Sequence, residues 1–472
     1  MLEEVLLSTA VGSFTINDDS YYTFSKSVVL NNDVSDAESM RFSNNHSIWS
    51  DWEDYAGVKS WVLAVGHSDK TVYGEFRHSN RNILQSNDTV TPLIEESITA
   101  SDGTGNDFFS GMHVSGVHGS PLSISSAGGT IVVGVPRDNS DQGSVYIYEW
   151  NGSSWVETKL TASDGVSNDG FGFSVSVSSN GNTIVVGSWL NDSDRGAVYV
   201  YRLNDGSWDE TKIIASDGVS GDTFGLSVSI SADGNTLIAG AYHDAPGGSA
   251  YIYKWDGLSW EETKLTTPLG STIFGFHVAV SSDGNIVAVG TPAGTGTVYM
   301  YSWDNSTWNE TIITASDGEA GDFFGRIVSL SSDGNILLTG AYRDDVGVNA
   351  DQGSAYIYRY TGSSWDETKI TVSDGESTDY FGYSASLSSD GNTMIIGAVS
   401  DTVEGVVDQG SVYIFRWNGN TWNEIKLIAS NGAASDLFGY SAFISGDGHT
   451  FAIGAPGATV GSNADQGAVY VF

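Results

Sequence analysis

Residues 171–201, FGFSVSVSSNGNTIVVGSWLNDSDRGAVYVY, contain the pattern that decides the fold. The stretch opens on Phe171-Gly172, alternates large and small residues at period two, and turns at Asn180-Gly181 before a continuous apolar run. A Tyr-rich segment at 196–201 and a Trp-x-Glu-Thr-Lys segment at 208–213 follow. Four strand-like segments in succession predict one four-stranded antiparallel sheet.

The same pattern occurs in seven copies, spaced about 50 to 60 residues apart. A repeat of this length with four strands is typical of a β-propeller blade. The copies open on Phe109, Phe171, Phe224, Phe274, Phe324, Phe381 and Phe438. We therefore predict an all-β fold with a seven-bladed β-propeller of four-stranded blades over residues 93–472.

The last copy lacks a fourth strand, and a matching segment lies before the first copy. Residues 93–103, LIEESITASDG, correspond to the Trp-x-Glu-Thr-Lys-Leu-Thr-Ala-Ser-Asp-Gly segment of the other copies. Closing a ring of blades removes exposed sheet edges. We therefore predict that this N-terminal strand completes the seventh blade and closes the propeller.

Residues 1–92 lack the repeat and form a predicted separate domain. Short alternating segments, such as KSWVLAV at 59–65 and KTVYGEFRHS at 70–79, predict a small β-sandwich. The aromatic-rich segments at 40–43 and 49–52 resemble those of a bacterial immunoglobulin-like module. That resemblance implies a spacer in a large surface protein. The aromatic residues are predicted to form its core, with a carbohydrate-binding face as the alternative.

Charge and composition narrow the choice of partners. The chain has 58 acidic and 19 basic residues, a net charge of −39, which disfavours nucleic acid and anionic membranes as partners. It has no cysteine, which excludes disulfides, thiol catalysis and Cys-ligated zinc. No apolar run is long enough for membrane insertion, and no signal peptide is visible. We expect a monomer or part of a larger chain.

The Phe-Gly opening, with Gly454-Ala455-Pro456 closing strand two of the last copy, resembles FG-GAP repeats. These are the units of the integrin α-subunit propeller and of many bacterial and archaeal surface proteins. The resemblance spans residues 93–472 and implies an extracellular or cell-surface propeller that binds a protein or carbohydrate. Calcium-binding members carry Asp-x-Asp-x-Asp-Gly-x-x-Asp between strands one and two. Here that loop is reduced to Ser-Ser-Asp-Gly-Asn or close variants, too few oxygens for calcium.

A second acidic set lies in the loops that lead from strand four into the next strand one. One interpretation is that these Asp residues cap turns by accepting backbone N–H bonds. The alternative is that some of them hold a divalent cation, such as calcium, together with backbone carbonyl oxygens. The candidate metal ligands are Asp164, Asp169, Asp317, Asp322, Asp374 and Asp379.

The loops between strands two and three lie on the same predicted face and vary in length. Aromatic and Arg side chains at their starts can stack or make bidentate contacts with a ligand. Packing into the protein is the alternative for each of them. The candidate ligand-binding residues are Trp189, Tyr242, His243, Tyr342, Arg343, Asp344, Asp345 and Asp401.

Signals for catalysis are weak. The eight His residues share no repeat position and show no metal-ligand spacing; His113 and His118 lie five residues apart at an insertion in the first copy. Phosphate-loop, nucleophile-elbow and HExxH motifs do not occur. We therefore predict a non-enzymatic binding or adhesion module. The alternatives are a structural spacer of a larger surface protein and a hydrolase or lyase acting on polysaccharide.

Overall fold

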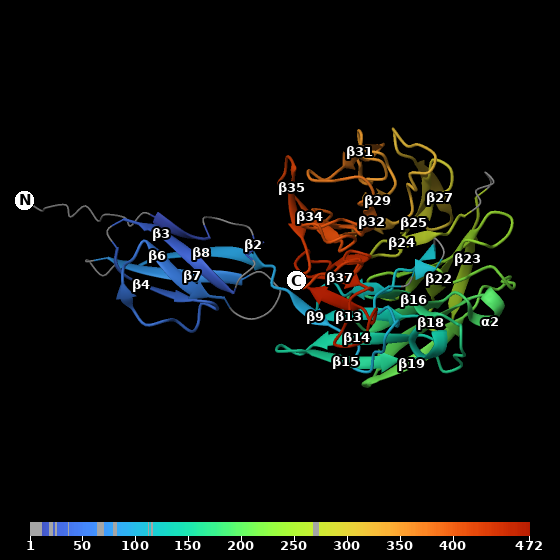
Figure 1. Cartoon of the computed structure of the whole chain (residues 1–472), viewed down its shortest axis with the longest axis horizontal. Helices are drawn as coiled ribbons and strands as arrows, with labels where there is room; N and C mark the ends of the chain where they lie inside the picture. The colour runs from blue at the N-terminus through green and yellow to red at the C-terminus, as the bar shows by residue number, and fades with distance from the viewer. Residues whose placement is uncertain are drawn as a thin grey trace, which may run out of the picture. The chain divides into compact units, whose positions relative to one another are not determined.

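The computed structural model divides the chain into two compact units, Met1–Glu96 with Phe472, and Ser97–Val471 (Figure 1). The residues that it describes are 12–17, 22–23, 26–35, 37–63, 70–78, 83–111, 113–114, 117–267 and 273–472. Strands dominate both units, so the all-β prediction is confirmed.

The described residues contain two one-turn helices, α1 (Asp138–Asp141) and α2 (Asn191–Asp194). Both lie in loops between strands and contain residues with left-handed backbone conformation. Within this part of the chain, neither helix has the length or apolar character needed to span a membrane.

Two sheets share one core in the N-terminal unit. Their orders are β1-β3-β6 and β2-β8-β7-β4-β5. The strands are β1 (Gly12–Ile16), β2 (Tyr22–Thr23), β3 (Ser27–Val34), β4 (Ala37–Ser43), β5 (Glu53–Asp54), β6 (Val58–Val62), β7 (Lys70–His78) and β8 (Ile83–Pro92). Phe14 of the first sheet packs edge to face on Phe42 of the second, with ring centroids 5.6 Å apart, and Phe42 packs likewise on Phe76. This is the predicted β-sandwich; its immunoglobulin-like character stays a prediction.

Strand β8 is absent from the strands expected in this unit. Its sequence, ILQSNDTVTP, is polar, and the described side chains alternate between exposed and half-buried along most of its length. It forms because its backbone pairs with β7 from Lys70↔Val90 to Arg77↔Ile83. Backbone pairing rather than apolar burial therefore defines this strand.

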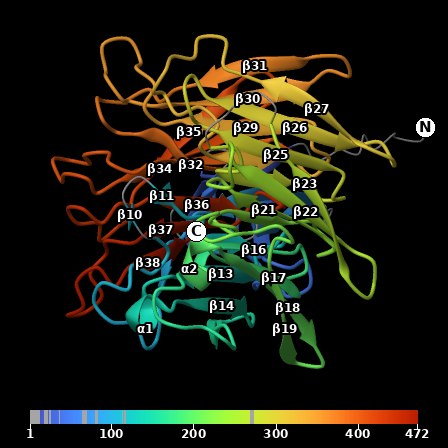
Figure 2. The same cartoon turned by 90° about the vertical axis from the view of Figure 1, so that its right-hand side faces the viewer.

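Seven four-stranded antiparallel sheets form the described part of the propeller, arranged around a common centre (Figure 2). In the first six, the strands pair in chain order. Their innermost strands are β12 (Leu122–Ile124), β16 (Phe171–Val177), β20 (Val228–Ile230), β24 (His277–Val280), β28 (Val328–Leu330) and β32 (Phe381–Leu387). The second strands are β13 (Thr130–Val135), β17 (Thr183–Ser188), β21 (Thr236–Ala241), β25 (Ile286–Thr291), β29 (Ile336–Ala341) and β33 (Thr393–Ala398).

The outer half of each of these six blades is a hairpin of strands three and four. The third strands are β14 (Ser144–Trp150), β18 (Ala197–Asn204), β22 (Ser249–Trp255), β26 (Thr297–Trp303), β30 (Ser354–Tyr360) and β34 (Ser411–Trp417). The fourth strands are β15 (Trp155–Leu160), β19 (Ser207–Ile213), β23 (Trp260–Leu265), β27 (Trp308–Ile313), β31 (Trp365–Ile370) and β35 (Trp422–Leu427).

The seventh blade joins the two ends of the propeller sequence. It has the order β36 (Ser441–Ile444), β37 (Phe451–Ala455), β38 (Ala468–Val471) and β9 (Glu96–Ile98). The innermost strands contact one another in succession around the centre, and β36 contacts β12. The ring is therefore closed, with the predicted N-terminal strand as the outer strand of the last blade.

Each strand-one Phe anchors its blade to the preceding one. Phe171 is fully buried, packs edge to face on Tyr199 and Tyr201, and donates its N–H to the Gln142 carbonyl at 3.0 Å. The following Gly172 has φ 91° and lies so close to the Ser144 carbonyl that a Cβ would collide with it. The Phe-Gly pair therefore reflects both burial and close backbone approach.

Strand one was predicted to start at this Phe in every copy, which is correct only for β16 and β32. Even there the register shifts after the Phe, because the positive-φ Gly interrupts the extended backbone. In the first copy, β12 begins well after Phe109, and the short hairpin β10 (His113–Val114) and β11 (Val117–His118) lies between them.

The turn predicted at Asn180-Gly181 is part of a loop longer than two residues. Ser178 and Gly181 form a β-turn, with the Gly181 N–H donating to the Ser178 carbonyl at 3.0 Å and φ 78° at Gly181. The Ser178 N–H then bonds the Thr183 carbonyl at 2.9 Å. Loops of this kind, built on a turn that ends in a positive-φ Gly, are a common alternative to the two-residue type.

Candidate functional site

The variable loops between strands two and three, with α1 and α2 among them, face the viewer in Figure 2; we call this side of the propeller the loop face. Loop length differs strongly between blades. The loops of the fifth, sixth and seventh blades, 342–353, 399–410 and 456–467, are the long ones. Those of the third and fourth blades, 242–248 and 292–296, are short. The loop face is therefore uneven, with three long loops next to one another.

The aromatic candidates are mostly buried. Trp189 and Tyr242 are 7% and 6% exposed and belong to one cluster with Phe173 and Leu226. Tyr342 is 7% exposed and packs in a second cluster. They follow strand two directly, and their side chains are packed inside these clusters instead of lying exposed. Their prediction as ligand contacts receives no support from these positions.

Two candidates at the same loops are exposed. His243 stacks on Tyr242 with ring centroids 3.9 Å apart. The Arg343 guanidinium lies over the rings of Phe323, Tyr342 and Tyr380, at 5.3, 5.5 and 5.9 Å from the centroids. Both remain accessible to a partner, and the aromatic rings below Arg343 hold its side chain against the surface.

The acidic candidates likewise include buried and exposed residues. Asp344 and Asp401 are each 6% exposed and form ion pairs with Lys369 at 2.6 Å and Lys426 at 2.7 Å. Asp345 is exposed, and its carboxylate accepts the backbone N–H of Asp351 at 2.8 Å. Buried, paired carboxylates of this kind stabilise the base of a loop, which leaves only the outer part of each loop for a ligand.

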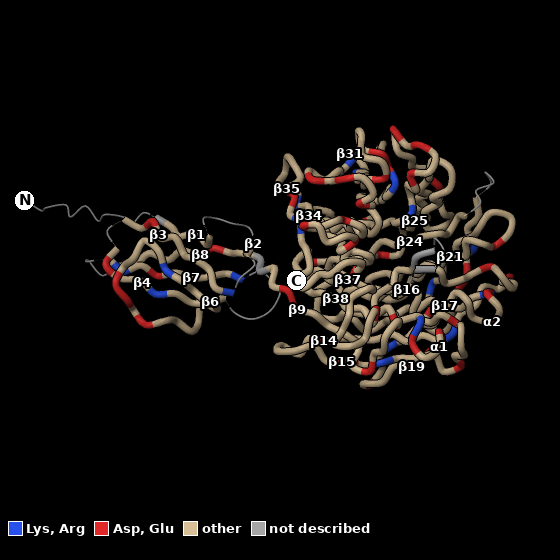
Figure 3. Tube along the Cα trace, in the orientation of Figure 1, with Lys and Arg blue, Asp and Glu red and all other residues tan. Residues whose placement is uncertain are grey.

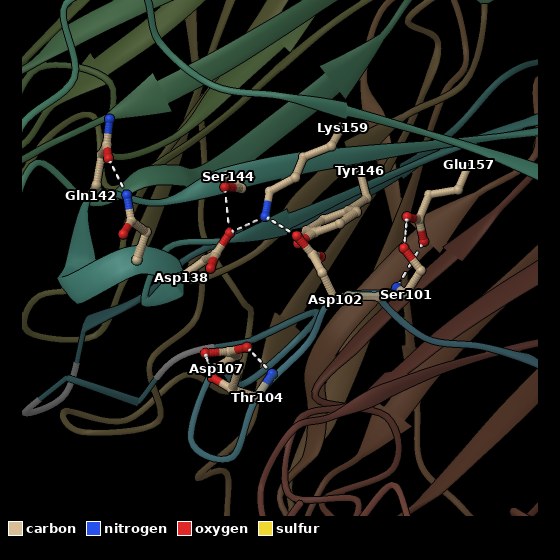
Figure 4. Close-up of polar contacts among 12 residues, drawn as sticks. Ser101, Asp102, Thr104, Asp107, Asp138, Gln142, Ser144, Tyr146, Glu157 and Lys159 are labelled. Carbon is tan, nitrogen blue, oxygen red and sulfur yellow. Dashed lines mark hydrogen bonds and ion pairs between the residues drawn. The ribbon is translucent and has the colours of Figure 1, made fainter.

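A repeated carboxylate–lysine–tyrosine network underlies the loop face. In the first blade, Lys159 of β15 lies 2.7 Å from both Asp102 and Asp138, and the Tyr146 hydroxyl donates to Asp102 at 2.6 Å (Figure 4). The Lys159 side chain bridges the loop that precedes the blade and the loop between its second and third strands. These contacts lower the pKa of Asp102, chiefly through the Lys159 bond.

Three of the candidate metal ligands occupy the Asp102 position in later copies. Asp164, Asp317 and Asp374 pair with Lys212, Lys369 and Lys426, each at 2.7 Å. Each also accepts a hydroxyl bond from the strand-three Tyr. An internal ammonium group thus lies where the calcium hypothesis places an ion.

The other three candidate metal ligands cap their own loops. Asp169, Asp322 and Asp379 accept the backbone N–H of the residue three positions earlier, at 2.9, 2.6 and 2.6 Å. Burial, followed by the charge of Asp401, raises the pKa of Asp379 to about 6. In the described residues, no group of three or more His, Asp or Glu side chains is arranged to hold a metal ion.

The network is incomplete in two blades. In the fourth, Ile312 replaces the Lys, and the Tyr299 hydroxyl instead receives a bond from Thr267 at 3.3 Å. The loop at 268–272, where the sequence lacks the acidic pair, lies outside the described residues. In the seventh, Ser97 and Asn431 replace the Lys and Asp, and Tyr470 donates to Asn431 at 2.8 Å.

Five segments of the chain match the family model described as FG-GAP repeat. They are residues 155–201, 208–253, 308–358, 365–415 and 422–472, together more than half of the chain. The chain belongs to the FG-GAP repeat family. Membership in this family makes it a binding or structural module.

Each matched FG-GAP segment runs from strand four of one blade to strand three of the next. Residues 254–307 lie outside the matched segments, although they contain three strands of the regular fourth blade. No curated protein matches the chain. One solved structure, described as "Structure of U3-55K", matches with a TM-score of 0.48 and 10% identity over 78% of this chain and 100% of that chain.

Two residues that the sequence analysis passed over lie at the centre of the loop face. Arg326, two residues after the FG-GAP Phe324, and His277 line a cavity of about 20 Å³ at the mouth of the central channel. A chamber of about 170 Å³ follows, and its lining shares Ser120 and His277 with the mouth. A comparison of the repeats could have identified Arg326, because the equivalent residue is apolar or aromatic in the other Phe-Gly copies. These residues are Phe173, Leu226, Phe276, Tyr383 and Tyr440.

Proposed function

We propose that this protein is a non-catalytic, extracellular or cell-surface module that binds a protein or glycan through the loop face of its propeller. The long loops of the fifth to seventh blades form the centre of the proposed binding surface. The alternative function is a structural spacer in a larger surface protein.

The observation that carries the proposal is the combination of fixed loop bases and exposed apolar residues on the outer parts of these loops. Each of these loops contains a short β-bridge of its own, Val346↔Asn349 in the fifth blade and Val403↔Val406 in the sixth, which restricts its conformation. Val348 is 97% exposed and Val407 57% exposed. A preorganised loop loses less conformational entropy on binding, and exposed apolar side chains supply contact area.

The negative charge of the protein disfavours acidic polymers, such as nucleic acid, as partners. Acidic residues, coloured red along the Cα trace in Figure 3, outnumber basic ones. The exposed valines favour a protein partner, because apolar side chains find more complementary area on a protein than on a hydrated sugar. Paired carboxylates, such as Asp344 with Lys369, act in this proposal as supports for the loops and not as catalytic acids.

The direct test is a binding screen of the whole chain against protein and glycan arrays, with calcium and with chelator. A ligand found there is then measured against the variant Val348→Ser/Val407→Ser, with an expected loss of at least about tenfold in affinity. Leu258→Ser is the matched control, because Leu258 is 90% exposed in the β22–β23 hairpin, away from these loops.

Two outcomes decide between the hypotheses. A ligand whose affinity is equal for wild type and the valine variant contradicts the proposed surface. The absence of any ligand in either condition contradicts the binding function and favours the spacer. An unchanged melting temperature on chelation contradicts the calcium hypothesis for the acidic loops.

A further inference from the structure

Arg326 is a buried cation without a counter-ion among the described residues. Arg326 is 5% exposed, and no carboxylate of the described residues lies within ion-pair distance of its guanidinium. Nη1 donates to the Tyr383 carbonyl at 2.7 Å, whereas Nη2 is buried and has no hydrogen-bond partner in the described part of the chain. A buried guanidinium with an unbonded nitrogen is costly, so a partner that supplies negative charge stabilises it.

Aromatic rings hold this guanidinium at the channel mouth. Its carbon lies 4.1 Å from the centroid of the Tyr383 ring and 4.8 Å from that of Tyr342. These contacts offset part of the desolvation of the charge, but they give Nη2 no hydrogen-bond acceptor among the described residues. The N–H groups of Nη2 therefore remain available to an acceptor.

The space beside Arg326 fits one small particle. The mouth cavity, about 20 Å³, is lined by Ser120, His277, Tyr383 and Tyr440 besides Arg326. A cavity needs roughly 10–15 Å³ of this kind of volume to hold one water molecule. A halide ion or one oxygen of a carboxylate has a comparable size, whereas a phosphate or sulfate is too large for the mouth.

The chamber below presents hydroxyl donors and no acid. Five Ser hydroxyls accept a backbone N–H bond from the next blade, and none has a described acceptor for its own proton. They are Ser123, Ser176, Ser229, Ser329 and Ser386. Among the described residues, neither cavity is lined by Asp or Glu. A lining with excess donors suits an acceptor-only occupant, which an anion is.

His277 adds a neutral donor to the mouth. Its Nδ1 accepts the Val328 N–H at 3.3 Å, so Nε2 carries the proton and donates to the Ser120 hydroxyl at 2.9 Å. Burial, followed by the nearby Arg326 charge, lowers the pKa of His277 to about 3. Arg326 is thus the only charged side chain that lines the two cavities in the described residues.

We propose that the mouth of the central channel binds one small monovalent anion, a halide or the carboxylate head of a small acid, on the free Nη2 of Arg326. The net charge of −39 opposes the anion at long range, but physiological salt screens such charges over about 8 Å. Contact with Arg326 acts within that distance. The site is independent of the ligand proposed for the loop face.

The test uses the whole chain crystallised without halide, soaked in sodium bromide and measured at the bromine absorption edge. One anomalous peak is expected within hydrogen-bonding distance of Arg326 Nη2. In solution, bromide or chloride at about 0.15 M is compared with isethionate, an anion too large for the mouth, at equal ionic strength. Halide should raise the melting temperature of the propeller by about 1–2 °C.

Arg326→Leu removes the charge and places at this position the residue that the third copy has, Leu226. We expect this variant to lose both the anomalous peak and the halide effect on melting. Arg359→Leu is the control, because Arg359 donates to the Gly391 carbonyl on the outer part of a blade and should leave both signals intact. Since the halide series uses wild type, the proposal stays testable even if Arg326→Leu does not fold.

A bromide peak elsewhere but not at Arg326, or a peak at high bromide with no difference in melting between halide and isethionate, overturns the proposal. Equal halide effects in wild type and Arg326→Leu also overturn it. Excess acetate in the bromide soak separates the two sources of the charge. If acetate displaces bromide and the peak is lost, the site also binds carboxylates. If the peak persists, the site binds halide only.

Discussion

The two faces of the propeller are made by the same repeats but are held together differently. On the face with the Ser-x-Asp-Gly turns, the side-chain bonds that shape each turn stay within a few residues: Ser331 donates to Asp333 at 2.7 Å, and the Asn335 N–H donates to Asp333 at 3.0 Å. Neighbouring turns are joined by backbone bonds, such as that from the Ser332 N–H to the Ser389 carbonyl at 2.8 Å. On the loop face, Lys369 binds Asp317, 52 residues earlier in the chain. One set of side-chain bonds is local and the other joins distant segments.

This difference explains where the copies diverge. A local turn needs one short motif, and close variants of that motif occur in each Phe-Gly copy. The loop-face network needs three segments at once, and it is lost in the fourth blade, where Ile312 replaces the Lys and the sequence of the preceding loop lacks the acidic pair. The loop face can therefore vary between blades while the opposite face remains uniform, which suits a scaffold that carries a binding surface on one side.

The largest expected effect comes from removing the Lys of a complete network. Lys369→Ile leaves the Asp344 carboxylate, 8% exposed, beside Asp317 without its cation. We expect a loss of about 2 kcal/mol in the free energy of unfolding, below the usual value for a buried pair because the Lys369 side chain is 28% exposed. Calorimetry of the propeller transition measures it.

The matched control is the reverse change in the fourth blade. Ile312 is 46% exposed and has no such carboxylate pair, so Ile312→Lys should change stability by less than about 0.5 kcal/mol. Equal effects of the two substitutions would show that the network contributes nothing to the fold.

A smaller effect is expected on the turn face. Asp333→Ala removes the acceptor of the Ser331 hydroxyl and of two Asn335 donors. Loss of such local side-chain bonds costs about 1 kcal/mol. The loss should be smaller than that of Lys369→Ile in the same calorimetric assay. The opposite order would contradict the difference drawn between the two faces.

The pH dependence of the loop face gives a third test. The pKa of Asp379, about 6 in the folded protein, lies above its ordinary value of about 3.8. Its contribution to stability is therefore full below pH 4 and is lost as pH rises through 6. Asp379→Asn has no such loss, so its stability relative to wild type should increase by about 1 kcal/mol between pH 4 and pH 7. Melting temperatures of both proteins across that range check it; a constant difference contradicts the burial argument.

The smallest effect is expected on the outer part of a long loop. Val348 is 97% exposed, so Val348→Ser should alter stability by less than about 0.5 kcal/mol while it weakens ligand binding. Thermal melting and the binding assay, run on the same preparation, separate the two properties. A large drop in melting temperature would mean that Val348 supports the loop and does not present a contact surface.

Much of the fold was predictable because each blade repeats a period-two pattern with fixed turns, and because residues 93–99 supply the strand missing from the last copy. Strand β8 was not predictable from apolar alternation, since its pairing with β7 and not its burial defines it. The starts of five inner strands were misplaced, and the apolar pattern does not reveal that the residue after every Phe, Ser110 in the first copy and Gly in the others, has positive φ.

The candidate site was harder to predict than the fold. Trp189 and Tyr242 lie at loop starts, where exposure was expected, but they are buried in one cluster with Phe173 and Leu226. The partner of Asp317 could not be identified because Lys369 lies 52 residues away. Arg326 was passed over, although its charge among apolar or aromatic equivalents in the other Phe-Gly copies marked it as unusual.

The pairing of β9 with β38 sets an order on folding. Closing a longer loop costs little additional entropy, but contacts between distant residues slow folding. During synthesis, the first six blades can form while β9 still waits for residues 468–471 to emerge, and the inner edge of β12 lacks its neighbour β36. Until then the nascent ring has an open gap that can pair with other chains. We therefore expect closure of the seventh blade to limit the folding rate of this protein and its exposure to misassembly.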